Sequence, residues 1–192
     1  HIQDADLAAI NKVMQTHMNL EMAVTDEMLD IAAQVRPSDV CLVPEKREEL
    51  TTEGGLDVAG QLDKVKAACR RLSADGIRAS LFIDPDRSQL DAAAAAGSPV
   101  VELHTGAYAD ADGEQQQIEL QRIVDAAHYG HNLGLIINAG HGLHIENVAA
   151  IAKISEIVEL NIGHSIVSNA VFDGLASAVT NMLRVMREAR RG

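Results

Sequence analysis

The 192-residue chain carries a formal net charge of −12, and only 2% of its residues are aromatic. Its hydrophobic share of 47% is enough for one packed domain, with a core of Ala, Val, Ile, Leu and Met. The acidic balance argues against nucleic acid or an anionic membrane as the main partner. No apolar run approaches the roughly 18 residues that a membrane span needs. Cys41 and Cys69 lack metal or redox spacing, so we expect two buried thiols in a reducing cytoplasm.

Helical and strand patterns alternate along the whole chain, which is typical of βα units around a parallel sheet. The first half is predicted to contain, in order, a helix over 4–17, a strand over 18–24, a helix capped by Thr25 and ended by Pro37, a strand over 39–43, and a helix with Val58 to Leu72 on its apolar stripe, closed by Gly76. The second half is predicted to contain a strand over 77–83, a helix over 84–96, a strand over 100–104, a helix over 114–131, a strand over 135–138, a short helix over 145–154, a strand over 158–162 and closing helices over 165–190. Six strands, each followed by a helix, predict a single α/β domain of the (β/α)-barrel type over residues 1–192.

Six units do not close an eight-stranded barrel and would leave two unpaired sheet edges. The sequence begins with His1 directly before a helix, so we expect two further βα units upstream of it. An open doubly wound sheet is the structural alternative, but no Gly-rich dinucleotide fingerprint follows any predicted strand.

Polar and apolar residues alternate inside three of the predicted strands. The polar pairs that share a strand face are Asn19 with Glu21, Glu102 with His104, and Glu159 with Asn161. The outer face of a barrel strand must meet helices, so we expect these pairs to point inward. Glu159 lies near a strand start, where a structural hydrogen-bond network is expected. Glu21 and Glu102 lie near strand ends, where barrel active sites gather, and a desolvated glutamate with a raised pKa is a natural general base.

A Gly-His pair follows each of the last two predicted strands, as Gly140-His141 and Gly163-His164. Glycine lets the backbone approach a ligand closely. The loops after the last two strands of a barrel, with a helix N-terminus, are its usual phosphate cradle. The pattern therefore predicts a phosphate site here with His141 beside it. A loop histidine without a task is the alternative for His141.

Residue types that bind metals are also present, namely Glu102, His104, His141 and His164. A metal site is disfavoured because no recognised metal motif is present and no Asp is expected to end a strand beside these residues. None of the predicted strands carries a lysine, so a protein-derived Schiff base is not expected. Any imine chemistry would need an amine brought by the substrate.

The long polar segment 44–57 follows the second predicted strand and contains Lys46, Arg47, Thr51 and paired glycines. It could be a solvated connector. Its length and its glycines favour a mobile active-site loop that brings cations over an anionic ligand.

Six motifs resemble those of the pyridoxine 5′-phosphate synthase family: Asn19 to Thr25, Leu42 to Arg47, Thr51 to Val58, Glu102 to Gly106, Asn138 to Leu143 and Asn161 to His164. The resemblance implies a TIM barrel that condenses 1-deoxy-D-xylulose 5-phosphate with 3-amino-2-oxopropyl phosphate. The products are pyridoxine 5′-phosphate, phosphate and water. It also implies no metal, no organic cofactor and a cytoplasmic homo-octamer. The aminoketone brings its own amine, in agreement with the lysine-free strands.

The same resemblance implies roles for single residues. Glu21 corresponds to a general base, His141 to a general acid and Glu102 to a transition-state stabiliser. The implied substrate-binding residues are Gly142, Gly163 and His164 for the aminoketone phosphate, and Thr51 and His1 for the sugar phosphate. The family's first two strands, with further site residues, would precede His1. The residues leave two other functions open: a metal-dependent barrel hydrolase or isomerase acting on a phosphorylated small molecule, and a non-catalytic phosphate-binding subunit.

Overall fold

The computed structural model describes residues 2–45 and 54–191. All six strands of its sheet are parallel and follow one another in sequence order: β1 (Asn19–Ala23), β2 (Asp39–Val43), β3 (Arg78–Ile83), β4 (Val100–His104), β5 (Ile136–Gly140) and β6 (Ile157–Asn161). A doubly wound sheet reverses its strand order at a switch point, and the described sheet contains no such reversal. The fold therefore matches six consecutive units of a TIM barrel, which confirms the predicted fold class.

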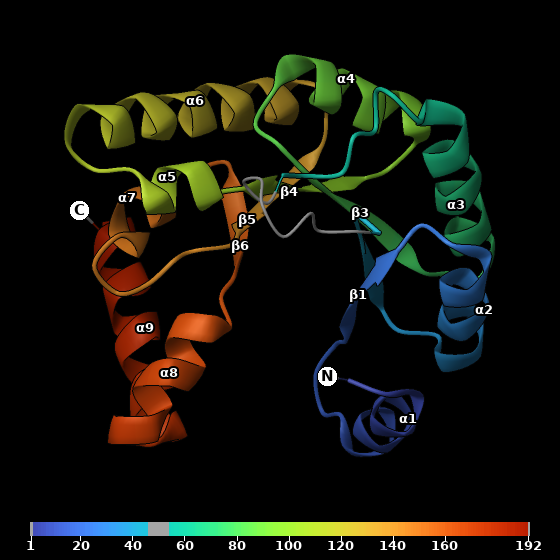
Figure 1. Ribbon diagram of the computed structural model, residues 1–192, viewed down its shortest axis with the longest axis horizontal. Helices are drawn as coiled ribbons and strands as arrows, with labels where there is room; N and C mark the ends of the chain where they lie inside the picture. Colours follow the sequence, from blue (N-terminus) through green and yellow to red (C-terminus); the bar gives the residue numbers. More distant parts are fainter. Residues whose placement is uncertain (1, 46–53, 192) are drawn as a thin grey trace.

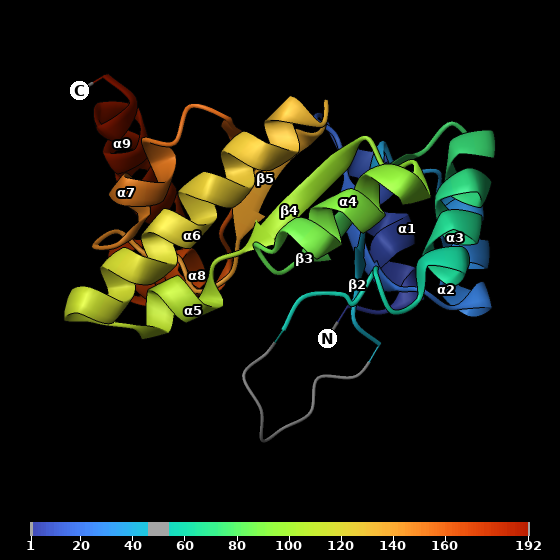
Figure 2. The ribbon, with the colours of Figure 1, turned by 90° about the horizontal axis from the view of Figure 1, so that it is seen from above.

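The helices form an arc outside the strands, from α1 at one end to α8 and α9 at the other (Figure 1). Their bounds are α1 (Asp4–Val13), α2 (Asp26–Val35), α3 (Leu62–Ala74), α4 (Arg87–Ala96), α5 (Gly106–Asp110), α6 (Gly113–Asn132), α7 (Val148–Ala152), α8 (His164–Asp173) and α9 (Leu175–Arg191). Seen from above, α4 and α6 cover the outer side of β3 to β5 (Figure 2). This arrangement leaves the inner side of the strands for the polar residues.

Local sequence signals set several of these boundaries. The Oγ1 of Thr25 accepts a hydrogen bond from the backbone N–H of Met28 at 3.2 Å, so Thr25 caps α2 as predicted. Gly97 ends α4 with φ 80°, a conformation that favours glycine. Strands β2 and β4 have the predicted bounds. The predicted helix over 4–17 is too long, because α1 ends at Val13 and no side chain in it is buried to stabilise a further turn.

The main hydrophobic core lies between the sheet and its helices. The fully buried strand side chains of this layer include Leu42, Leu81, Leu103 and Ile137. Cys41 and Cys69 are buried free thiols, as predicted. Within the described ranges, no helix is both long and apolar enough to cross a membrane.

Replacing Leu103 by Ala should lower the free energy of unfolding by about 3 kcal/mol, because it removes a fully buried side chain from the core layer. Denaturant unfolding of both proteins measures this difference. The matched control is Leu175→Ala, whose side chain is 62% exposed and whose loss should cost well under 1 kcal/mol. Equal losses for the two variants would contradict the described core.

Candidate active site

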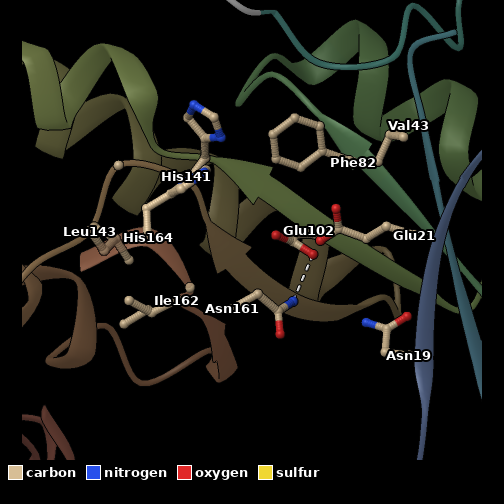
Figure 3. A pocket seen from close by; sticks show the side chains of 12 residues that line it. Asn19, Glu21, Val43, Phe82, Glu102, His141, Leu143, Asn161, Ile162 and His164 are labelled. Carbon is tan, nitrogen blue, oxygen red and sulfur yellow. Dashed lines mark hydrogen bonds between the residues drawn. The ribbon is translucent and has the colours of Figure 1, made fainter. Parts of the chain in front are cut away.

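A cavity of about 400 Å³ opens where the strands end, and four of the six polar strand residues line it, namely Asn19, Glu21, Glu102 and Asn161 (Figure 3). Its lining comprises Asn19, Glu21, Val43, Phe82, Glu102, His141, Gly142, Leu143, Asn161, Ile162, Gly163 and His164. All predicted site residues that the structure describes are therefore brought together. The two others, His1 and Thr51, lie outside the described residues, as do positions 46–53 of the predicted active-site loop.

Strand alternation places the polar pairs on the inner side of the sheet. Neighbouring strands are in register there, with Glu102 of β4 beside Asn138 of β5, and Asn138 beside Glu159 of β6. The Nδ2 of Asn138 donates to Oε1 of Glu159 at 3.2 Å, and His17 Nε2 lies 3.8 Å from Oε2 of the same carboxylate. Glu159 thus belongs to a hydrogen-bond network, as predicted, although it lies in the middle of β6 and not near its start.

Glu102 is the most buried charged group of the cavity, with a residue exposure of 3%. Its Oε2 accepts hydrogen bonds from Asn161 Nδ2 at 2.7 Å and from the Cys41 thiol at 3.6 Å. The pKa of Glu102 is raised to about 7 in total: burial is the largest cause, the Asn161 hydrogen bond opposes it, and the negative charge of Glu21 adds to the rise. The carboxyl group can therefore take up or release a proton near neutral pH.

Gly140 provides the space that the Glu102 carboxyl group occupies. A Cβ at this position would lie 2.3 Å from Oε1 of Glu102 and 2.9 Å from the carbonyl oxygen of Asn161. The close approach of β5 to both residues thus requires glycine at the end of β5.

Glu21 reaches the same cavity from β1, but its side chain is exposed. Figure 3 shows its carboxyl group and that of Glu102 pointing into the same part of the cavity. The expectation that both carboxylates are desolvated therefore holds for Glu102, whereas Glu21 is exposed in the described sheet. The reason is position: Glu21 lies on β1, an edge strand of the described sheet, whereas β4 has a neighbour on each side.

His141 lies in a strained turn after β5. Its φ of 82° is in the left-handed region, which costs a non-glycine residue on the order of 1 kcal/mol or more. The buried hydroxyl of Thr105 donates to the carbonyl oxygens of Gly140 at 2.7 Å and of His141 at 2.6 Å, which holds this turn in place. Gly142 follows with φ 75°, and a Cβ there would lie 2.6 Å from the Cβ of Ala109. Such strain held by its surroundings is typical of functional positions.

The second glycine turn leads directly into a helix. Gly163 precedes α8, and both Gly163 and His164 line the cavity. The Ser165 hydroxyl donates to the carbonyl oxygen of Leu143 at 2.7 Å and so links the loops after β5 and β6. The N-terminal amides and dipole of α8 favour an anionic group at this end of the cavity.

The sequence patterns do not predict the contact between Asp84 and His104. Asp84 directly follows β3, and its Oδ1 lies 3.0 Å from Nδ1 of His104. The prediction that no Asp ends a strand beside Glu102 and His104 is therefore wrong. Across residues 2–45 and 54–191, no group of three or more His, Cys, Asp or Glu side chains is arranged to hold a metal ion.

The cavity at the carboxyl ends of parallel strands, with two carboxylates, a histidine and a helix N-terminus, defines the site of a (β/α)-barrel enzyme. Residues 1–188 match the family described as "Pyridoxal phosphate biosynthesis protein PdxJ". The chain therefore belongs to the PdxJ family.

Similar proteins agree with this assignment. The chain is 61% identical to the pyridoxine 5′-phosphate synthase of Photobacterium profundum, over 100% of this chain and 79% of that protein. It is 60% identical to the pyridoxine 5′-phosphate synthase of Aliivibrio fischeri, with the same coverage. A crystal structure of a xylose isomerase domain protein from Planctomyces limnophilus matches 90% of this chain and 72% of that one, with a TM-score of 0.54 and 12% identity. That structure supports the barrel fold alone.

The Glu102 carboxyl group should titrate near pH 7 in the folded protein, far above the exposed glutamates, because burial disfavours its charged form. Carboxyl ¹³C NMR, with Glu102→Gln to assign the signal, measures this directly. Asn161→Leu should raise the midpoint further by removing the hydrogen bond that favours the carboxylate. A Glu102 midpoint near that of the exposed glutamates would contradict the described burial.

The raised pKa of Glu102 should also make the free energy of unfolding depend on pH. The folded-state pKa of Glu102 is raised, so its favourable contribution is complete below the unfolded-state pKa and is lost as the pH rises through about 7. Over this range, the free energy of unfolding should fall more steeply with pH than it does in Glu102→Gln.

Proposed function

We propose that the protein is a pyridoxine 5′-phosphate synthase of vitamin B6 biosynthesis. It condenses 1-deoxy-D-xylulose 5-phosphate with 3-amino-2-oxopropyl phosphate and forms pyridoxine 5′-phosphate, phosphate and water. The observation that carries the proposal is the meeting of Glu21, Glu102 and His141 in one cavity of a chain that belongs to the PdxJ family. Relatives about 60% identical over the whole chain bear this enzyme's name.

The proposed chemistry is proton transfer around an imine that the substrate's own amine forms. The six described strands carry no lysine, which supports a substrate amine as the nitrogen nucleophile. Glu21 acts as the general base, and its exposed carboxylate reaches into the cavity from β1. His141 acts as the general acid that protonates a departing oxygen. Glu102 stabilises charge in the transition state, and its pKa of about 7 lets it hold or release a proton there.

Two phosphate groups need two binding places. In the proposal, the aminoketone phosphate contacts Gly142, Gly163 and His164, where amides and the start of α8 supply donors. The sugar phosphate is assigned to Thr51 and His1. The net charge of −12 supports local capture of both phosphates, because the overall field of the protein repels anions.

The remaining assignments of the proposal follow from the family resemblance. The enzyme works without a metal or an organic cofactor, as a homo-octamer in the cytoplasm, and its partners are its two phosphorylated substrates. Neither nucleic acid nor a membrane is a proposed partner.

A metal-dependent hydrolase or isomerase is the second candidate, and the contact between His104 and Asp84 is the observation in its favour. Metal analysis of the purified protein and assays with a chelator separate the two functions: a synthase keeps full turnover in the chelator. Calorimetry with each substrate tests the third candidate, a phosphate-binding subunit, which would bind without turnover.

Incubation of the full-length protein with both substrates should yield pyridoxine 5′-phosphate. Glu21→Gln should lower kcat at least about 100-fold, because an amide cannot act as a base, while phosphate binding persists. The matched control Glu188→Gln lies on α9, outside the cavity lining, and should keep full activity. Absence of product from the unsubstituted protein would refute the proposed reaction, and unchanged turnover in Glu21→Gln would remove Glu21 as the base.

A further inference from the structure

Asp84 and His104 form a hydrogen-bonded pair beside His141 that the roles proposed above do not use. Oδ1 of Asp84 lies 3.0 Å from Nδ1 of His104 and also accepts a hydrogen bond from the backbone N–H of Gly55 at 3.1 Å. The hydrogen bond to His104 holds the pKa of Asp84 below its usual range. The carboxylate is therefore an acceptor only, and Nδ1 of His104 carries the proton.

The His104 ring also packs against the ring of His141. The two ring centroids are 5.0 Å apart, and the ring planes are inclined by 62°. Both rings lie beside Gly106, where a Cβ would lie 2.6 Å from Nε2 of His104 and 3.3 Å from Cδ2 of His141. Glycine at this position thus allows the two imidazoles to approach each other.

The contact between the two imidazoles is buried, and it includes one nitrogen atom of His104 that lacks a described hydrogen-bond partner. His104 is only 7% exposed, and its Nε2 has no hydrogen-bond partner among the residues that the structure describes. The Phe82 ring packs edge-on against His104, with centroids 5.0 Å apart, and lies 6.2 Å from His141. A buried polar atom of this kind calls for a functional explanation.

We propose that Asp84 and His104 are positioning residues for His141. The Asp84 carboxylate fixes the His104 tautomer with the proton on Nδ1, so Nε2 presents its lone pair beside Gly106, where Cδ2 of His141 also lies. A lone pair at this place favours the protonated form of the neighbouring imidazole, which is the form that a general acid needs. The inference rests on the role of His141 in the proposed function.

Other titratable groups line the cavity that His141 enters, and any pH profile contains their contribution. They are Glu21 from β1, Glu102 from β4 and His164 from the start of α8. Variants that leave these three residues unchanged isolate the contribution of Asp84 and His104.

The first arm of the test is the kinetics of Asp84→Asn in the full-length protein. Asparagine keeps the size and the acceptor oxygen but removes the charge, so kcat should fall about 10-fold with KM nearly unchanged. The alkaline limb of the kcat profile should move to lower pH, because the acid loses its proton more easily. Glu156→Gln is the matched control: Glu156 Oε1 pairs with His128 Nδ1 at 2.8 Å outside the cavity lining, and its loss should change neither kcat nor the limb.

A second variant distinguishes the loss of the positioning role from misfolding of Asp84→Asn. His104→Asn keeps a donor toward Asp84 but removes the Nε2 edge, and it should reproduce the fall in kcat with a Tm close to that of the unsubstituted protein. Unchanged turnover, or a fall in kcat without movement of the alkaline limb, would overturn the positioning role.

The second arm does not depend on turnover. In ¹⁵N NMR of the unsubstituted protein, His104 should show a protonated Nδ1 and a bare Nε2. Asp84→Ala should mix the tautomers of His104 and shift the imidazole signals of His141, whereas Glu156→Gln should shift neither. Signals of His141 that ignore Asp84→Ala overturn the inference. A protein that forms no pyridoxine 5′-phosphate but shows these shifts refutes the proposed function and keeps the coupling of the two histidines.

Discussion

The burial of the Glu102 carboxyl group is the constraint around which the site is arranged. A carboxylate taken out of water is costly unless it is hydrogen-bonded or protonated. Asn161 and Cys41 donate to it from β6 and β2, and Gly140 leaves room for it at the end of β5. Residues of three strands thus accommodate one side chain of a fourth strand. The part of the desolvation cost that they do not offset raises the pKa of Glu102 to about 7.

Glycine residues also determine where His141 and His104 lie. Gly140 and Gly142 flank His141, whose left-handed backbone is held by the Thr105 hydroxyl. Gly106 then allows His104 to approach His141. The left-handed backbone of His141 and the unsatisfied Nε2 of His104 both lie at strand ends, while the layer between sheet and helices is a buried apolar cluster. A rigid scaffold of this kind can carry a strained site without losing its fold.

Patterns of short range were sufficient to predict much of this architecture. Two-residue alternation predicted that Glu21, Glu102 and Asn161 share the inner face, and the bounds of β2 and β4 followed from their apolar runs. Local patterns do not predict the short helix α5, because a tertiary contact holds it: the hydroxyl of its Tyr108 donates to the carbonyl oxygen of Asn147 at 2.8 Å.

Features that depend on neighbours distant in sequence were not predictable in this way. The contact of Asp84 with His104 joins the end of β3 to the end of β4, whereas local sequence patterns place Asp84 only at the start of the predicted helix over 84–96. The different exposures of Glu21 and Glu102 follow from their places at the edge and the centre of the described sheet. The roles of His1 and Thr51 stay predictions, because both lie outside the described residues.

A crystal structure of the full-length protein with 3-amino-2-oxopropyl phosphate tests the central claim most directly, namely that this cavity binds and activates the aminoketone. The account predicts the phosphate on the amides of Gly163 and His164 at the start of α8, with the amine facing the carboxyl groups of Glu21 and Glu102. A phosphate bound away from α8, or an amine directed out of the cavity, would contradict it.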